Sequence, residues 1–219
     1  MSKAITIYGT ITSPYVNRVV MACRRKGLKF RVFLPEGGSK SPEILAINPL
    51  GKIPTIKDAR TVLFESGVIL EYLDVKYPKG KLIPAGAVAG ARVRLLGAMC
   101  ENYILLMLIR LFVQALSKKP DKVIVVDTVK KLDNSLDALD QFIQPGPYAY
   151  GNSFSAADCY IVSSMIFLER VGGMMGGKDL LGNKRRNLGR YWTAIKKEDI
   201  VKETIADIQA SYQERQMPH

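Results

Sequence analysis

The sequence Ala4-Ile-Thr-Ile-Tyr8-Gly-Thr-Ile-Thr-Ser13-Pro14 decides how the first part of this chain folds. Its first five residues form a short apolar run rich in β-formers, which predicts a strand. The glycine, threonines, serine and proline after them predict a turn. Apolar residues then recur at helical spacing over 16–23, and Gly27 is placed to end that helix. The chain therefore begins with a strand, a turn and a helix.

The rest of the first 80 residues continues this alternation. The predicted elements are a strand at 29–34, a helix at 41–46, strands at 54–57 and 61–64, and a helix at 67–76 capped by Ser66. Asp58-Ala-Arg60 joins the last two strands, which indicates a hairpin. The resulting order is βαβαββα, which is typical of a small α/β domain.

The composition changes at Tyr77, where a connector with proline and glycine begins. Every long segment beyond it has helical periodicity, and we predict helices at 89–116, 121–142, 156–171, 187–195 and 200–213. The expected fold class is α/β plus all-α. The expected domains are residues 1–80, a linker at 81–88 and an all-helical domain at 89–219. Gly172-Gly-Met-Met-Gly-Gly177 predicts a flexible surface loop.

The stretch 95–116 is apolar enough to raise the question of a membrane span, which needs about 20 apolar residues. Four polar residues interrupt it, namely Glu101, Asn102, Arg110 and Gln114. Charged side chains are costly in lipid. We therefore predict a buried helix of a bundle and no membrane partner.

Composition excludes several kinds of site. The single histidine is His219, the last residue, so neither a histidine-dependent nucleophile nor a histidine-based zinc site is expected. Cys23, Cys100 and Cys159 lie far apart without a Cys-x-x-Cys pair, which suits a reducing cytosol. The first residues contain no apolar stretch of signal-peptide length. We expect a cytoplasmic protein without a metal.

The chain is basic, with 32 Lys and Arg against 20 Asp and Glu and a net charge of +12. Residues 1–80 hold 13 basic and 6 acidic side chains and residues 81–219 hold 19 and 14, so the excess is shared by both parts. The basic clusters are short and no aromatic residues interleave them. We favour a solvated basic face that attracts small anions over a nucleic-acid site.

Ser13 has two interpretations. It stands before Pro14 at the start of the first helix, and a serine N-cap with proline at the next position is frequent there. The same place puts a hydroxyl beside free backbone N–H groups and the positive end of the helix dipole, where it can stabilise a thiolate. The residue alone favours the plain cap.

Three further motifs also have a plain and a functional interpretation. Pro54 is an ordinary trans edge-strand proline or a cis proline that turns the preceding backbone toward a ligand. Glu65-Ser66 is a helix cap or a pair that clasps the ammonium and carboxylate of an amino acid. Ser155-Ala-Ala-Asp158 is a capping box, which we interpret as structural.

Four segments together resemble the cytosolic glutathione transferases over nearly the whole chain. They are Ser13-Pro-Tyr-Val-Asn-Arg18, Asn48-Pro-Leu-Gly-Lys-Ile-Pro54, Phe64-Glu-Ser-Gly-Val-Ile-Leu-Glu-Tyr-Leu73 and Phe154-Ser-Ala-Ala-Asp158. The resemblance implies a thioredoxin-like N-terminal domain that holds glutathione, an all-helical domain that lines the second-substrate pocket, and a homodimer. The Ser-Pro start is similar to the serine-type classes, particularly the plant tau pattern.

The resemblance also implies roles for individual residues. Ser13 would be the catalytic residue that hydrogen-bonds the glutathione sulfur. Lys40 and Lys52 look like the positions that meet the glycyl carboxylate, Ile53 would pair its backbone with the cysteinyl moiety before cis-Pro54, and Glu65 and Ser66 look like the γ-glutamyl clasp. Glutathione would be the co-substrate, and the family requires no metal.

The pocket for the second substrate is harder to assign. Tyr15, Tyr103, Met107 and Arg110 are the candidates. A stripe of methionine and aromatic residues is more often core than pocket, although such side chains suit irregular apolar ligands. Arg110 has two further interpretations, as the binding site of an acidic substrate or as the partner of a carboxylate.

The leading functional hypothesis is an enzyme that activates glutathione for attack on a hydrophobic electrophile, including ether or thioether cleavage by the same thiolate. A thiol-disulfide exchanger is disfavoured because position 13 is serine. The alternative from another class is a non-catalytic binding or assembly module with the transferase fold.

Overall fold

The computed structural model describes residues 4–144 and 146–216 and divides the chain into two compact units. One unit runs to Ile83 and also includes the segment from Glu198 onward, and the other runs from Pro84 to Lys197. The sequence placed the segment from Glu198 onward in the helical domain. The structure groups it with the first unit, so that unit is discontinuous in sequence.

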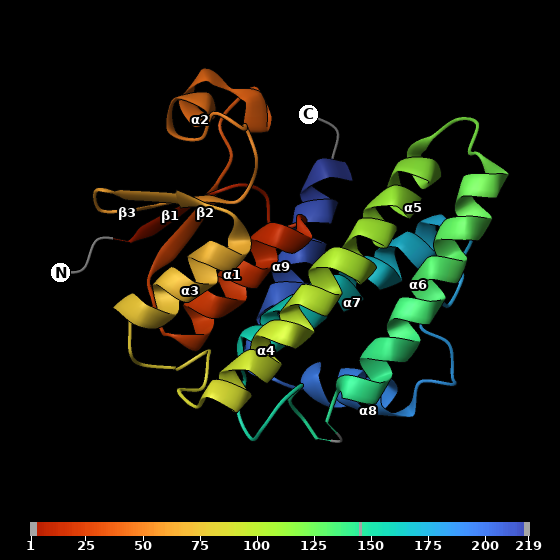
Figure 1. The fold of residues 1–219 in the computed structure, drawn as a ribbon. Coiled ribbons are helices and arrows are strands. Elements are labelled where there is room, and N and C mark those ends of the chain that lie inside the picture. The colour runs from red at the N-terminus through yellow and green to blue at the C-terminus, as the bar shows by residue number, and fades with distance from the viewer. Residues whose placement is uncertain (1–3, 145, 217–219) are drawn as a thin grey trace. The chain divides into compact units, whose positions relative to one another are not determined.

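The first unit contains a four-stranded sheet in the order β2-β1-β3-β4. Its strands are β1 (Ile5–Tyr8), β2 (Phe30–Phe33), β3 (Thr55–Asp58) and β4 (Thr61–Phe64). The β1–β2 pair is parallel and the other two pairs are antiparallel. Figure 1 shows α1 (Pro14–Arg25) and α3 (Ser66–Lys76) on one face of the sheet, with α2 (Pro42–Ile47) on the other side. A 3₁₀ turn, Gly38–Lys40, precedes α2. The predicted βαβαββα order and the thioredoxin-like sheet are confirmed.

Helix α1 lies at the centre of this unit, and Val16, Val19 and Val20 are fully buried. It ends as predicted, because Gly27 has φ of 65° and the Leu28 N–H donates to the Cys23 carbonyl at 3.0 Å.

Arg24 holds the last helix, α9 (Asp199–Gln216), against α1. Its guanidinium nitrogens lie 3.0 Å from Glu203 Oε2, 2.6 Å from Asp207 Oδ2 and 2.6 Å from Thr204 Oγ1. These contacts explain why α9 belongs to the first unit. Helical periodicity predicts that residues 200–213 form a helix. It does not show which unit that helix packs on.

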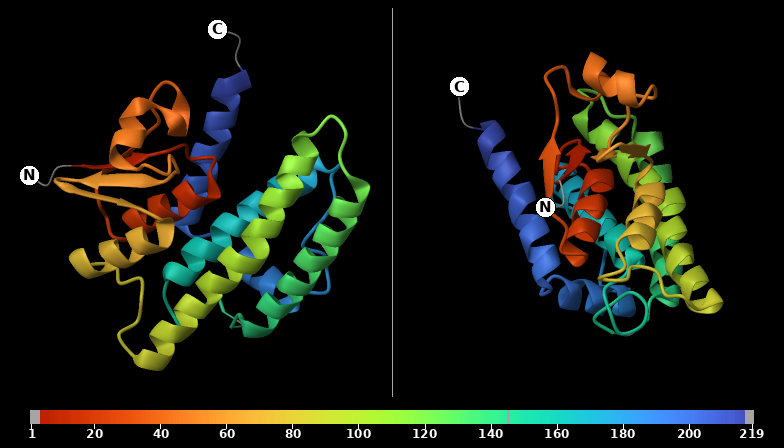
Figure 2. Two further views of the ribbon diagram at one scale, coloured as in Figure 1. Left: turned by 45° about the horizontal axis from the view of Figure 1, so that its top comes forward. Right: turned by 90° about the vertical axis from the view of Figure 1, so that its left-hand side faces the viewer.

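Helical segments form the described part of the second unit (Figure 2). They are α4 (Ala87–Met99), a π-helical turn (Cys100–Leu105), α5 (Leu106–Leu116), α6 (Lys122–Phe142), α7 (Ala156–Met174) and α8 (Arg186–Ile195). Helices α4 and α5 both pack on α7, and α5 also packs on α6. The prediction of an all-helical bundle is confirmed for this part of the chain.

The segment Ala87–Leu116 is one helix of 30 residues that is apolar and long enough to cross a membrane. Only 39% of its most apolar window is buried, so the predicted buried helix is buried on one side alone. The other side exposes Leu95, Tyr103, Leu106 and Val113.

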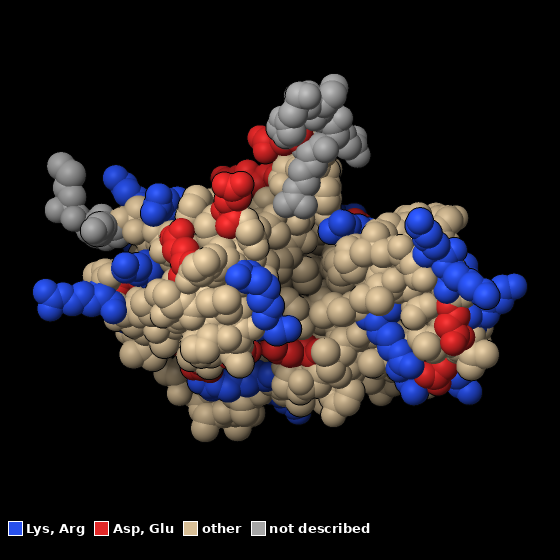
Figure 3. Space-filling view, turned by 90° about the horizontal axis from the view of Figure 1, so that it is seen from above, with Lys and Arg blue, Asp and Glu red and all other residues tan. Residues whose placement is uncertain are grey.

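Lys and Arg side chains are spread over the surface drawn in Figure 3, with Asp and Glu among them. This distribution agrees with the expectation of a solvated basic face.

A buried carboxylate organises the start of α7. Asp158 has no exposed surface and accepts hydrogen bonds from the backbone N–H of Ala149 (2.8 Å) and of Ser155 (2.7 Å). The hydroxyls of Ser155 (2.9 Å) and Tyr191 (3.1 Å) donate to it as well. Burial raises the pKa of Asp158 to about 6, although all four hydrogen bonds act in the opposite direction. The capping box is present, and it also joins α8 and the α6–α7 loop.

Asp158→Ala should lower the free energy of unfolding by about 3 kcal/mol, because it leaves four buried donors without their acceptor. Ser155→Ala is the matched control, since it removes one hydroxyl and should cost about 1 kcal/mol. Denaturant titration measures both, and equal losses would show that the carboxylate does no more than cap one helix.

Candidate functional site

Ser13 occupies the N-cap position of α1, but its hydroxyl does not cap the helix. The Ser13 N–H donates to the Thr10 carbonyl at 3.0 Å, and its own carbonyl accepts from Val16 and Asn17. The backbone is extended, with φ of −79° and ψ of 127°, and no side-chain cap hydrogen bond is formed. The hydroxyl is half-buried beside the N-terminal turn of α1, which carries no acidic side chain.

A buried asparagine holds the loop that contains Lys52, Ile53 and Pro54. Asn48 is fully buried, and its side-chain nitrogen donates to the Lys52 carbonyl and to Thr55 Oγ1, both at 3.0 Å. Its side-chain oxygen accepts from the Leu50 N–H at 3.1 Å. The Ile53–Pro54 peptide bond at the end of this loop is cis.

Gly9 allows that loop to approach the loop before Ser13. A Cβ at position 9 would lie 2.5 Å from Val16 Cγ2 and 3.4 Å from Ile53 Cβ, and Gly9 has φ of 153°. A side chain here would clash with Val16 of α1, while Ile53 of the other loop lies at contact distance. The segment with Ile53 and the segment with Ser13 are thus neighbours in the first unit.

The two predicted lysines, Lys40 and Lys52, lie before and after the loop that contains Asn48. Lys40 Nζ donates to the Leu50 carbonyl at 2.9 Å, and a Cβ on Gly51 would lie 2.9 Å from that nitrogen. The side chains of Lys40 and Lys52 are both exposed, so both charges are accessible to an anion.

The start of α3 differs from the sequence prediction in one respect. The N-cap is Glu65, whereas Ser66 is the first residue of the helix, so the assignment of Ser66 as the cap is wrong. Glu65 is exposed and has φ of 66°, a left-handed conformation that is uncommon for a side chain with a Cβ. Such conformations cost about 1–3 kcal/mol and cluster at functional sites.

Arg18 is a residue of this site to which the sequence assigned no role. It is fully buried, and its Nη1 donates to Ser66 Oγ at 3.1 Å. Its guanidinium carbon lies 4.9 Å from the centre of the Tyr15 ring. A charged residue in the middle of an otherwise apolar helix was the available signal. Arg18 links the helix that carries Ser13 to the start of α3.

The sequence model of the family described as "Glutathione S-transferase, N-terminal domain" matches residues 12–76. Glutathione S-transferase 3 of Zea mays is 28% identical over 216 residues, which cover 93% of this chain and 94% of the relative. A stringent starvation protein A homolog of Pasteurella multocida is also 28% identical, over 77% of this chain and 76% of its own length.

Solved structures agree with these relatives. Poplar glutathione transferase F1 is 26% identical with a TM-score of 0.81, and covers 95% of this chain and 100% of its own. A glutathione S-transferase from Methylobacillus flagellatus with glutathione bound is 25% identical with a TM-score of 0.78, and covers 92% and 98%.

Residues 12–76 thus match the N-terminal domain of glutathione S-transferases, and the chain is similar to glutathione transferases over nearly its whole length. All the residues for which the resemblance implied contact with glutathione lie in the first unit of the chain. They are Ser13, Lys40, Lys52, Ile53, Pro54, Glu65 and Ser66. The loop contacts of Gly9 and the Arg18 hydrogen bond connect three of the segments that carry them. The roles of these residues, and the tau-like detail, stay predictions.

The candidate residues for the electrophile divide between the units. Tyr15 is half-buried on α1 in the first unit. In the second unit, Tyr103 lines a hollow of about 280 Å³ together with Met99 and three residues of α6. Met107 is half-buried and Arg110 is exposed. The pKa of Asp127 on α6 is lowered first by a hydrogen bond from Lys131 and to a smaller extent by the charge of Arg110.

Glu65→Gly should separate the effect on stability from the effect on glutathione binding. Glycine adopts the left-handed conformation without strain, so the free energy of unfolding should stay unchanged or rise by up to about 1 kcal/mol. Loss of the carboxylate should weaken glutathione binding by about tenfold, which corresponds to about 1.4 kcal/mol. Thermal unfolding and glutathione titration calorimetry measure the two effects.

Ala59→Gly is the matched control, because Ala59 has φ of 54° in the β3–β4 turn. It should give the same gain in stability with unchanged glutathione affinity. Wild-type affinity in Glu65→Gly would remove Glu65 from the binding site.

Proposed function

We propose that this chain activates the thiol of glutathione as a thiolate and transfers it to a small hydrophobic electrophile. The observation that carries the proposal is the Ser13 hydroxyl, which lies at the N-terminus of α1 and makes no cap hydrogen bond. The sulfur attacks an electrophilic carbon, a sulfur–carbon bond forms, and the leaving group departs with its electron pair. Ether or thioether cleavage uses the same step.

The Ser13 hydroxyl and the N-terminus of α1 can together supply the free energy needed to ionise the glutathione thiol at neutral pH. A free thiol with a pKa near 8.5 is only about 3% ionised at pH 7, and lowering the pKa by two units makes it about three-quarters ionised. Two units correspond to about 2.7 kcal/mol. A hydrogen bond from Ser13 to a thiolate contributes about 1.5–3 kcal/mol, and the helix terminus adds about 0.3–1 kcal/mol. No general base is needed.

The other residues of the first unit bind the ends of the tripeptide in this proposal. Lys40 and Lys52 meet the glycyl carboxylate, and the backbone of Ile53 pairs with the cysteinyl moiety. The exposed carboxylate of Glu65 receives the γ-glutamyl ammonium, while Ser66 meets the γ-glutamyl carboxylate. The hydrogen bond from buried Arg18 supports this assignment, because it fixes the Ser66 hydroxyl.

We further propose that Tyr15, Tyr103, Met107 and Arg110 line the electrophile pocket. Tyr103 and Met107 supply polarisable apolar surface for an irregular ligand. A cytoplasmic location belongs to the same proposal, and it is supported by the three cysteines, which are free and buried.

A second candidate function is a binding or assembly module without turnover. The relatives named stringent starvation protein A homologs favour it, because that name does not describe a transferase. Retention on immobilised glutathione together with turnover of a generic electrophile supports the enzyme. Retention without turnover, or neither, supports the module.

Ser13→Ala should raise the pKa of bound glutathione by one unit or more and reduce turnover at neutral pH by at least about tenfold, as about 1.4 kcal/mol requires. Glutathione affinity should change little, because binding is spread over five other residues. Thiolate absorbance and turnover against pH measure both effects.

Thr12→Ala is the matched control, since it removes the neighbouring hydroxyl, which contacts only Thr10 Oγ1 at 3.1 Å among the hydrogen bonds described. It should leave the pH profile in place. In Ser13→Cys, the new thiolate should attack the disulfide of added oxidised glutathione, forming a mixed disulfide and releasing one reduced glutathione. Overlapping profiles for wild type and Ser13→Ala would contradict the catalytic role of the hydroxyl.

A two-fold homodimer completes the proposal, with the N-terminal domain of one subunit against the helices of the other. Two hollows lie between the α4–π segment and α6, one beside Leu95 and Phe142 and one beside Tyr103. Exposed apolar side chains along this face supply the area that association buries.

Leu95→Glu should convert the dimer to a monomer at micromolar concentration, because it places a charge in the apolar part of that face. Sedimentation velocity measures the change. Leu116→Glu, at the far end of α5, is the control and should stay dimeric. A monomeric wild type would overturn the proposed assembly.

A further inference from the structure

The sequence predicts a flexible surface loop at 172–177, but Gly172, Gly173 and Met174 form the end of α7, and a turn follows them. A Cβ on Gly172 would lie 2.3 Å from the Lys178 carbonyl oxygen, and the Lys178 N–H donates to the Gly172 carbonyl at 3.0 Å. Gly176 and Gly177 have φ of 84° and 77°, which glycine adopts at low cost. The chain therefore folds back closely onto the end of α7, and glycine is required where the two segments touch.

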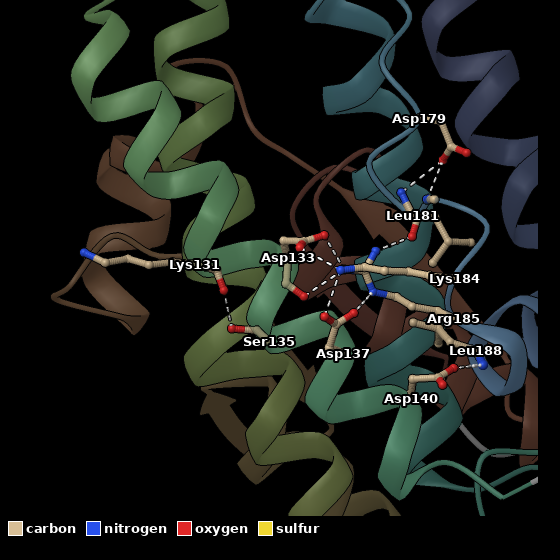
Figure 4. A network of polar contacts seen from close by, with 11 residues as sticks. Lys131, Asp133, Ser135, Asp137, Asp140, Asp179, Leu181, Lys184, Arg185 and Leu188 are labelled. Carbon is tan, nitrogen blue, oxygen red and sulfur yellow. Dashed lines mark hydrogen bonds and ion pairs between the residues drawn. The ribbon is translucent and has the colours of Figure 1, made fainter.

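Arg185 anchors the returning segment on α6 (Figure 4). It is 3% exposed, and its guanidinium donates to the carbonyl of Leu181 and, at 2.8 Å, to the carbonyl of Asp133. Its Nε lies 2.9 Å from Asp137 Oδ1. The Asp179 carboxylate accepts from the N–H groups of Leu181 and Gly182 at 3.0 and 3.1 Å. These bonds hold residues 179–185 as a fixed wall.

A cleft of about 280 Å³ lies between this wall, α7 and α8. Met165, Leu168, Leu180 and Trp192 line it, so its inner surface is largely apolar. An apolar cavity of about 150 Å³ is enough to bind benzene. This cleft has room for one aromatic ring with a short side chain or for two fused rings.

A carboxylate stands among these apolar residues. Glu169 Oε1 accepts from the indole N–H of Trp192 at 2.7 Å, and Lys196 Nζ lies 3.6 Å from the same oxygen. The Glu169 side chain is 55% exposed. A carboxylate has about four acceptor positions, so it has capacity for a donor from a bound molecule. The lining also includes Asp179 and Lys178, so two carboxylates stand against one lysine and their net charge opposes an anion.

We propose that this cleft binds a small aromatic molecule that donates a hydrogen bond, an arylalkyl amine or alcohol of one or two rings. The ring lies among Leu168, Leu180 and Trp192, and the donor faces Glu169. An amine binds more tightly than an alcohol because it also carries the opposite charge. Every residue that lines the cleft belongs to the second unit, so binding requires no glutathione and does not rest on the proposed reaction.

Trp192 is the only tryptophan of the chain, so its fluorescence reports on this cleft directly. Titration of the whole protein with benzylamine should change the emission with a saturable curve. Benzyl alcohol should bind more weakly, and benzoate should give no saturable change. Glu169→Gln keeps an acceptor without the charge, and should weaken benzylamine binding at least fivefold while removing its advantage over the alcohol.

Gly173→Leu should block the cleft without disturbing the fold. Gly173 lines the cleft within α7, no atom lies within 4 Å of an added Cβ, and its φ is not left-handed. Gly189→Leu in α8 is the matched control, because an added Cβ there also meets nothing within 4 Å and Gly189 does not line the cleft. Binding should be lost in the first variant and kept in the second, with wild-type circular dichroism in both.

Three results would overturn the proposal. They are the absence of saturable binding in the wild type, wild-type binding in Gly173→Leu, and benzoate affinity equal to that of benzylamine.

Discussion

A helix that is buried along most of its length must find partners inside the protein for its polar side chains, and α1 is such a helix. The charged groups on it and at its end reach different segments. Arg18 bonds Ser66 at the start of α3, Arg24 bonds α9, and Lys26 bonds buried Asp74 at 3.0 Å. The first unit is therefore assembled around one helix, whose N-terminus also presents Ser13.

This constraint explains why few residues are needed to position the candidate site. Arg18 donates a hydrogen bond to Ser66 at the start of α3, and Ser13 is the residue proposed to act on sulfur. The two lie five positions apart, Ser13 at the N-cap of α1 and Arg18 within the helix. Asn48 fixes the loop that carries Ile53 by hydrogen bonds within residues 48–55, and the missing side chain of Gly9 leaves room for Val16 of α1. A transferase and a binding module can both be built on this arrangement, and they differ in whether the Ser13 hydroxyl acts on a thiolate.

Much of the fold could be predicted from the sequence. The spacing of the apolar residues that face the core differs between strands and helices, so it shows which element each segment forms. The βαβαββα order and the helical second unit are of this kind. The unit to which α9 belongs could not be predicted, since it depends on Arg24 meeting three side chains about 180 positions away. Local patterns also mistook Ser66 for a cap, because the hydrogen bond that occupies its hydroxyl comes from Arg18. The unused Ser13 hydroxyl depends on a rotamer, which no sequence pattern specifies.

The position of α9 has a consequence for synthesis. Domains generally fold as units while the chain emerges from the ribosome, N-terminal parts first. Here the first unit also includes α9, which follows the second unit in the sequence. Arg24 can therefore contact Glu203 and Asp207 only after the second unit has been synthesised. The helical unit is contiguous and can fold earlier.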